Sequence, residues 1–408
     1  MSLPGTEVVT IESLRAALEA GELIFHYQPK VSMVLGTVCG AEALIRWCRP
    51  DGTMIGPAAF IPLAESTGFI TEITSYMLDK LVADLVIARA ADPTLTVSFN
   101  ASARDFEDDR LVQAIVRLLE LGIVPADALE VELTESAVLQ AGPALSERLG
   151  VLRSRGVRLA MDDFGTGYSS IDTLSKLPFT ALKIDQGFVL RMETSSKDAS
   201  IVEASILMGH RIGLEVVAEG IETESVFMQL QAAGCSIGQG YWMARPQPLD
   251  RLIALLRGGQ RWPAGAIGLL HMATLDHLEW RKALIDALLS DDRQLHTDGL
   301  TRFELDPTEC RLGRWYNGPG RGLSDLSAFA RLGEAHVALH DCAGQITAAS
   351  KAGGRMAALL PSLRKLTEHS THIVALLQEL EHDVLTRLTV GERTRTQRVL
   401  SKRPPPAE

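Results

Sequence analysis

Carboxylate and amide side chains recur on or at the ends of short apolar runs in the first part of the chain. They are Glu42, Asn100, Glu132, Glu135, Asp162, Asp163, Asp185, Glu219 and Gln239. Because no comparable cluster of histidine or cysteine accompanies them, these oxygen donors indicate Mg²⁺ or Mn²⁺ rather than Zn²⁺. The adjacent pair Asp162 and Asp163 can serve two ions, an arrangement suited to displacement at phosphorus. Any one of these acids could instead cap a helix or face solvent, but their shared position favours a site.

The apolar runs indicate the elements that position these side chains. Eight runs occur, at residues 23–28, 40–47, 94–100, 129–133, 157–162, 181–184, 214–218 and 236–241. Helix-compatible stretches separate most of them, which predicts a TIM-like (β/α)8 barrel of the α/β class. The first two runs are joined by a link too short for a helix, so we expect one antiparallel strand. Since the carboxyl ends of barrel strands share one face, the acidic side chains should converge there.

Eight short motifs follow one another between residues 14 and 256. They are YQP (27–29), EALIRW (42–47), NAS (100–102), ELTES (132–136), DDFGTGYSS (162–170), LKID (182–185), AEGIE (218–222) and GQGY (238–241). Together they resemble the motifs of the EAL family of cyclic di-GMP phosphodiesterases. The resemblance implies that Glu42, Asn100, Glu132 and Asp162 hold one metal ion. Asp162 and Asp163 would hold a second, with Asp162 as the bridge.

The resemblance also implies roles around the two ions. Lys183 would help to activate the attacking water, Glu219 would be the general base or a metal partner, and Gln239 would position the water. Glu135 would hold the loop 164–170 in place. Substrate contacts are implied for Gln28, Leu44, Arg46, Asp185 and Pro246. Because every ligand position is filled, we expect an active hydrolase that forms linear pGpG, and the alternative is a silent receptor that only binds cyclic di-GMP.

A break rich in Gly and Pro at residues 258–265 separates the barrel, at 1–257, from a region with a different pattern. Apolar residues at three- and four-residue spacing predict helices at 267–289, 326–349 and 356–388. We therefore expect an all-α four-helix bundle over residues 266–390. Residues 291–325 read as a long connection, and 391–408 as a disordered tail.

Four side chains of the helical region form a set of zinc ligands. His336 and His340 lie four residues apart, on one face of the predicted helix, although such a pair is often only a surface or core pair. His277 on the first helix and Cys310 in the connection complete the set. The arrangement resembles the chemoreceptor zinc-binding domain, which implies one Zn²⁺. Four protein ligands leave no open position, so this ion would be structural or sensory, and the Cys310 thiolate could make it redox-sensitive.

Composition and charge limit the partners. The 408 residues carry a formal charge of −11, with 22 Lys and Arg against 33 Asp and Glu through residue 261 and 18 against 18 beyond it. This balance disfavours polymeric nucleic acid but not a small phosphate ligand. Five scattered cysteines, no leader-like segment and no long apolar run favour a cytoplasmic protein without membrane insertion. Both resemblances imply a homodimer. Zinc or oxidant sensing, with the barrel as its output, is a further hypothesis.

Overall fold

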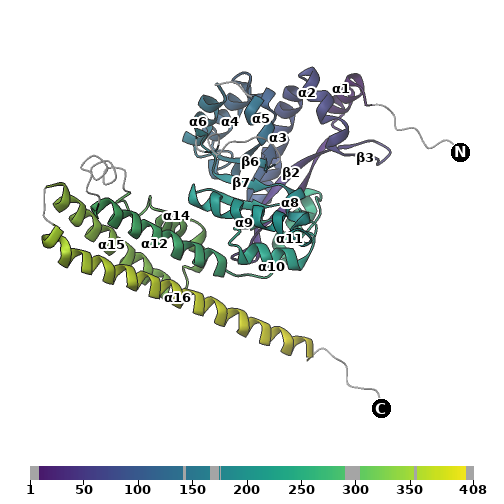
Figure 1. Ribbon diagram of the computed structural model, residues 1–408. Helices are drawn as coiled ribbons and strands as arrows, with labels where there is room; N and C mark the ends of the chain where they lie inside the picture. The colour runs from purple at the N-terminus through teal and green to yellow at the C-terminus, as the bar shows by residue number, and fades with distance from the viewer. Residues whose placement is uncertain are drawn as a thin grey trace, which may run out of the picture.

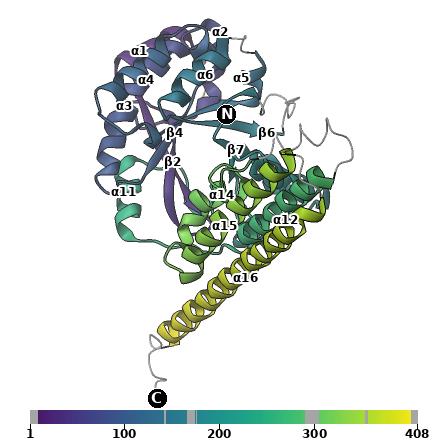
Figure 2. The same cartoon turned by 90° about the vertical axis from the view of Figure 1, so that its left-hand side faces the viewer.

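The computed structural model describes residues 9–140, 144–165, 174, 176–289, 304–352 and 356–400. Its first part is a barrel closed by pairing of the first two strands. Figures 1 and 2 show this part, with its strands surrounded by helices, next to the long helices of the second part. The barrel strands are β1 (Leu23–Ser32), β2 (Thr37–Cys48), β4 (Thr96–Asn100), β5 (Leu129–Thr134), β6 (Arg158–Phe164), β7 (Ala181–Ile184), β8 (Glu215–Ala218) and β9 (Ile237–Gly238). A short β3 (Met54–Ile55) extends β2 as a hairpin. The predicted eight-stranded barrel is confirmed.

Strand direction follows from the lengths of the connections. β1 runs antiparallel to both of its neighbours, β2 and β9, because only four residues join it to β2 and cannot form a crossover helix. All pairs from β2 and β4 through β8 and β9 are parallel. The carboxyl ends of the parallel strands therefore open on one face of the barrel.

Helices cover the outside of the barrel. They are α1 (Ile11–Glu19), α2 (Ile61–Thr67), α3 (Ile70–Arg89), α4 (Arg110–Glu120), α5 (Glu135–Gln140), α6 (Ala144–Ser154), α8 (Gln186–Arg191), α9 (Ser196–Arg211), α10 (Glu224–Ala232) and α11 (Leu249–Gly258). Helix α4 shows how they attach: Leu111, Val112 and Ile115 are buried, and the intervening polar residues face outward. This spacing of three and four residues places one apolar stripe against the sheet. None of the described helices is both long and apolar enough to cross a bilayer.

The second part is a bundle of helices α12 (Ile267–Leu289), α14 (Arg311–Asn317), α15 (Ser327–Lys351) and α16 (Met356–Leu400). Its core includes Leu284, Leu332, Leu339 and Leu377, all almost fully buried. The bundle confirms the predicted all-α second domain, and α16 projects well beyond the other helices (Figure 2).

Two segments of this region differ from the pattern that the sequence indicates. The expected connection at 291–325 contains α14 and the 3-10 helix η4 (Pro319–Leu323), which are too short and too rich in glycine to give a periodic signal. The tail expected from residue 391 is helical as far as Leu400, because Gly391 alone does not end a helix and no proline occurs before residue 404. Residues 401–408 lie outside the described part.

The break at 258–265 is packed against the barrel. Trp262 is buried in the apolar cluster under β8 and α10, and its backbone N–H donates to the Gly36 carbonyl at 3.0 Å. The Gly265 N–H donates to the Met33 carbonyl at 3.1 Å. At Gly268, a Cβ would lie 2.5 Å from the Gly234 backbone nitrogen, so only glycine allows this close approach of α12 to the barrel.

Candidate metal sites

The ends of three strands bring together the acidic side chains that the sequence scatters. Carboxylate oxygens of Glu42 on β2, Glu132 on β5 and Asp162 on β6 lie within 4.8 Å of one another, and all three side chains are buried. Asp162 belongs also to a second group, with Asp163 and Glu219. Asp162 is thus shared by both groups, and its role as a bridge between two ions stays a prediction.

Two amides complete the first group. The Asn100 Nδ2 donates to Glu42 Oε1 at 2.7 Å, and the Gln239 Nε2 donates to Glu42 Oε2 at 2.7 Å. The Gln239 Nε2 also reaches Gln28 Oε1 at 3.1 Å. The buried Gln239 Oε1 finds no hydrogen-bond partner among the described residues. Since buried polar atoms are rarely left unpaired, this oxygen fits a metal-bound water as its partner.

Lys183 lies at the centre of the acidic group. Its Nζ is 2.5 Å from Glu132, 2.7 Å from Glu219 and 3.0 Å from Asp162. Burial opposes the charged form, but these carboxylates outweigh it and raise the pKa of Lys183 well above its usual value. These carboxylates therefore favour the ammonium form of Lys183, which donates hydrogen bonds to them.

The carboxylates outnumber that cation. Burial, against the opposing charge of Lys183, raises the pKa of Glu219 well above its usual range, and the nearby acids Asp162 and Glu42 add to the rise. Burial and neighbouring acids likewise raise the pKa of Asp162. Mutual repulsion of buried carboxylates is what divalent cations relieve. The oxygen-only donor set thus fits Mg²⁺ or Mn²⁺.

Asp163 and Glu135 shape the segment after β6. Asp163 has a φ of +55°, and it is the sole non-glycine residue of the described part with a positive φ. Such a backbone is strained for most residues and clusters at functional sites. The buried Glu135 accepts from the Gly165 N–H at 3.1 Å, as its predicted loop-holding role requires. Residues 166–170 of that loop lie outside the described residues.

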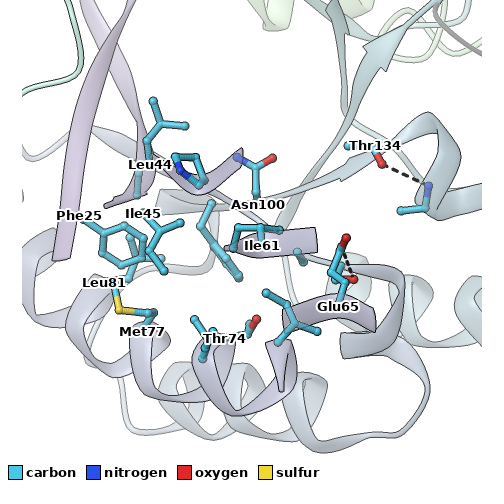
Figure 3. Close-up of a pocket in the computed structure, with 18 of the residues that line it drawn as sticks. Phe25, Leu44, Ile45, Ile61, Glu65, Thr74, Met77, Leu81, Asn100 and Thr134 are labelled. Carbon is cyan, nitrogen blue, oxygen red and sulfur yellow. Dashed lines mark hydrogen bonds between the residues drawn. The ribbon is translucent and has the colours of Figure 1, made fainter. Parts of the chain in front are cut away.

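A hollow of about 520 Å³ opens beside the metal ligands. Leu44, Asn100 and Asp163 line it, and Figure 3 shows Leu44 and Asn100 on one side of apolar residues that include Ile61 and Leu81. Its mainly apolar wall next to polar ligands is typical of a small-molecule site.

The other predicted substrate contacts occupy different positions. The half-buried Arg46 donates to the Ile45 carbonyl at 2.8 Å, and Asp185 caps α8 by accepting from the Gly187 N–H at 3.0 Å. Pro246 adjoins Gln247, which pairs with Tyr27 of β1. Their contact with a substrate stays a prediction.

Lys30 was missed by the sequence analysis. It is 3% exposed, and its Nζ contacts Glu132 at 2.8 Å and Glu130 at 2.7 Å. The signal was available: Gln28 and Lys30 lie two residues apart on one strand, so both point into the barrel.

Comparison with known families identifies the barrel. Residues 11–246, more than half of the chain, match the family model of the EAL domain. The chain belongs to the EAL domain family. The matched range includes every predicted ligand of the barrel.

Two relatives by sequence and one solved structure are similar to this EAL barrel. A cyclic di-GMP phosphodiesterase of Pseudomonas aeruginosa is 40% identical over 57% of this chain and 40% of its own length. The bifunctional diguanylate cyclase/cyclic di-GMP phosphodiesterase MucR of the same organism is 38% identical over 60% of this chain and 36% of its own. The chain thus spans about two fifths or less of these relatives. A solved structure of the PaMucR phosphodiesterase with c-di-GMP is 38% identical, with a TM-score of 0.57, over 59% of this chain and 98% of that one.

A second group of ligand atoms lies in the bundle attached to the EAL barrel. Cys310, His336 and His340 are buried, with ligand atoms within 4.8 Å of one another. The Cys310 Sγ is 3.1 Å from His336 Nε2 and caps α14 by accepting from the Gly313 N–H at 3.3 Å. Within the described part, the buried His340 Nε2 has no hydrogen-bond partner. A hydrogen bond of 2.8 Å joins His340 Nδ1 to the Leu305 carbonyl, so Nδ1 carries the proton and Nε2 is free to bind metal.

His277 lies beside this group without joining it. Its Nε2 is 2.8 Å from Ser370 Oγ. Burial lowers the pKa of His336 to about 3, and the neighbouring His340 and His277 add to this decrease. Burial lowers the pKa of His277 to about 4. Both imidazoles are therefore neutral near pH 7, as metal binding requires. Coordination by His277 stays a prediction.

Residues 277–347 match the chemoreceptor zinc-binding domain. This range includes all four predicted zinc ligands, and the mixed sulfur and nitrogen donors fit Zn²⁺.

Proposed function

We propose that this protein hydrolyses cyclic di-GMP to linear pGpG by attack of an activated water on one phosphodiester. The observation that carries the proposal is the convergence of Glu42, Glu132, Asp162, Asp163 and Glu219 with the unpaired Gln239 oxygen at one end of the barrel. The names of the relatives and the c-di-GMP in the PaMucR structure support this substrate.

The residues of the site divide the chemistry among them. Two divalent cations held by the acidic groups would polarise the phosphodiester and lower the pKa of the attacking water. Lys183 orients that water by donating a hydrogen bond. Glu219, whose raised pKa makes it a stronger proton acceptor than an exposed glutamate, takes the proton. The Arg46 guanidinium clamps a phosphate oxygen of the substrate.

A catalytically silent receptor is the alternative, and product analysis separates the two. We expect purified protein with Mg²⁺ or Mn²⁺ to convert cyclic di-GMP to pGpG, measured by chromatography. Glu42→Gln and Asp162→Asn should abolish turnover, whereas the exposed control Glu224→Gln should not. Binding without any product from the unsubstituted protein would favour the receptor.

We infer further that the bundle binds one Zn²⁺ and regulates the barrel. Contacts between the two domains support this coupling. Glu279 on α12 pairs with Arg211 on α9 of the barrel and, at 3.0 Å, with Arg311 on α14. In the sequence, Arg311 directly follows the proposed zinc ligand Cys310. The second partner of Arg311 is Asp276, at 3.4 Å, and Asp276 directly precedes His277. A shift of either ligand therefore acts on a contact with the barrel.

The test compares hydrolysis rates across controlled free zinc, in the unsubstituted protein and in Cys310→Ser. Rates that change with zinc only in the unsubstituted protein support regulation, and equal rates in every state contradict it. Rates that change with a thiol oxidant in the same pair would identify a redox input. The proposal includes a homodimer, by analogy with both families, and a cytoplasmic location, for which the five free thiols give support.

A further inference from the structure

A series of ion pairs, buried near the metal site and partly exposed at its far end, runs through the barrel. It begins at Glu132, passes to Lys30 at 2.8 Å and then to Glu130 at 2.7 Å. Glu130 continues to Arg158 at 3.2 Å, and Arg158 pairs with Glu215. The proposed reaction uses Glu132 alone among these residues, and the other four have no assigned role.

This series of ion pairs determines how Glu132 can present its carboxylate to the metal site. Its Oε1 is held by Lys30, and its Oε2 is 2.5 Å from Lys183. The two ammonium groups differ in their surroundings. Lys183 also contacts Glu219 and Asp162 within the metal site, whereas the second partner of Lys30 is Glu130, outside that site. Lys183 thus divides its contacts among several acids of the metal site, whereas Lys30 is held between Glu130 and Glu132.

The backbone of Lys30 is also held in place by strand pairing. It lies on β1, the antiparallel strand, which pairs along its whole length with β2. Its Nζ cannot withdraw without leaving two buried carboxylates, 4% and 0% exposed, short of a counter-charge. Uncompensated buried charge is strongly destabilising, so this contact is a permanent part of the folded barrel.

We propose that Lys30 is a positioning residue for the catalytic metal: it holds one oxygen of Glu132, so that the carboxylate offers only the other oxygen to the ion. This inference rests on the proposed phosphodiesterase function and refines its metal site. A carboxylate bound through one oxygen leaves a coordination position for the attacking water, whereas a carboxylate bound through both oxygens fills it. The nearby positive charge also weakens the attraction between Glu132 and the cation.

The competing explanation is that Lys30 only neutralises Glu130. A matched pair of variants separates the two explanations: Glu130→Gln as the reference, and Lys30→Met/Glu130→Gln. In this pair the amide of residue 130 requires no counter-ion, so the two variants differ in the hold on Glu132 and in the one positive charge beside it. Both full-length variants are prepared with zinc bound, and their thermal unfolding is recorded as a check on folding. Mn²⁺ binding is measured by calorimetry, and turnover of cyclic di-GMP by chromatography.

We expect the double variant to bind Mn²⁺ about tenfold more tightly than Glu130→Gln, yet to turn over about tenfold more slowly. Damage to the fold would weaken metal binding, and loss of the Lys30 charge alone would tighten it without slowing turnover, so tighter binding together with slower turnover identifies positioning. Equal or weaker Mn²⁺ affinity in the double variant overturns the inference, as does equal turnover. Should the unsubstituted protein form no pGpG, the proposed function fails, and the Mn²⁺ titration still decides whether Lys30 restrains Glu132.

Discussion

Replacing Asp105 by asparagine should stabilise the barrel at neutral pH. Asp105 lies in the 3-10 helix η2 (Ala103–Phe106) and is 4% exposed. Its Oδ2 accepts from the Ser102 N–H at 2.9 Å and from the Thr74 hydroxyl at 3.0 Å. Burial raises the pKa of Asp105 to about 6, although these hydrogen bonds oppose the rise. Asparagine keeps the acceptor for both donors and removes the buried charge.

The pKa shift of Asp105 sets the magnitude and the sign of the expected change in the free energy of unfolding. The usual value is 3.8, so the folded state binds more protons than the unfolded state between about pH 4 and pH 6. Stability therefore falls as pH rises through that window, and the full penalty is present above it. A shift of about 2 units corresponds to an upper limit of about 3 kcal/mol. We expect Asp105→Asn to raise the free energy of unfolding by about 2 kcal/mol at pH 7.5, and by close to nothing below pH 4.

Urea unfolding of the two proteins at pH 7.5 and pH 4.0, followed by circular dichroism, measures the difference. Asp108→Asn is the control, because the exposed Asp108 carboxylate has its pKa lowered by hydrogen bonds to Arg110, so its replacement should bring no gain. A gain of similar size at both pH values, or a loss at pH 7.5, would refute the reasoning.

Three other predictions concern the site and its regulation. Glu279→Gln should reduce the ratio of hydrolysis rates with and without zinc by up to about fivefold, since its two half-exposed ion pairs contribute about 0.5 kcal/mol each; an unchanged ratio would show that coupling takes another route. Gly240→Ala should slow hydrolysis at least about tenfold, because its Cβ would lie 2.1 Å from a backbone oxygen of the segment after β8. Gly258→Ala, where a Cβ meets no described atom within 4 Å, should leave the rate unchanged. Cys310→Ser should lose its zinc by elemental analysis and unfold at a lower temperature, whereas Cys342→Ser should keep the metal.

Local pattern was enough to predict the barrel and the convergence of its acids. Glu42, Glu132 and Asp162 lie on or at the ends of apolar runs, and any closed barrel of mainly parallel strands brings such positions toward one face. The local sequence pattern was less informative for a residue whose role depends on a partner far away in the sequence. The pairing of Lys30 with Glu130 and Glu132 spans about 100 positions along the chain, and nothing near Lys30 in the sequence identifies these partners.

Short elements and domain contacts were beyond the reach of periodicity. Helix α14 covers seven residues, fewer than are needed for an apolar stripe to repeat. The contact of Glu279 with Arg211 joins two exposed positions, which in the sequence are indistinguishable from other surface charges. The predicted fourth zinc ligand shows a different limit: the sequence selects His277, but the orientation of its ring toward Ser370 depends on the packing of α12 against α16.

The buried Trp262 has a practical consequence for dissecting this protein. The family match ends at residue 246, and the sequence pattern places the barrel boundary at 257. A fragment cut at either point would lack an indole that packs in the apolar cluster between the barrel strands and their outer helices, 8% exposed in the intact chain. Its low activity or aggregation could then be mistaken for loss of activation by the bundle. The unit that folds therefore extends beyond the unit that family resemblance defines, and truncations that isolate the barrel should end after residue 266.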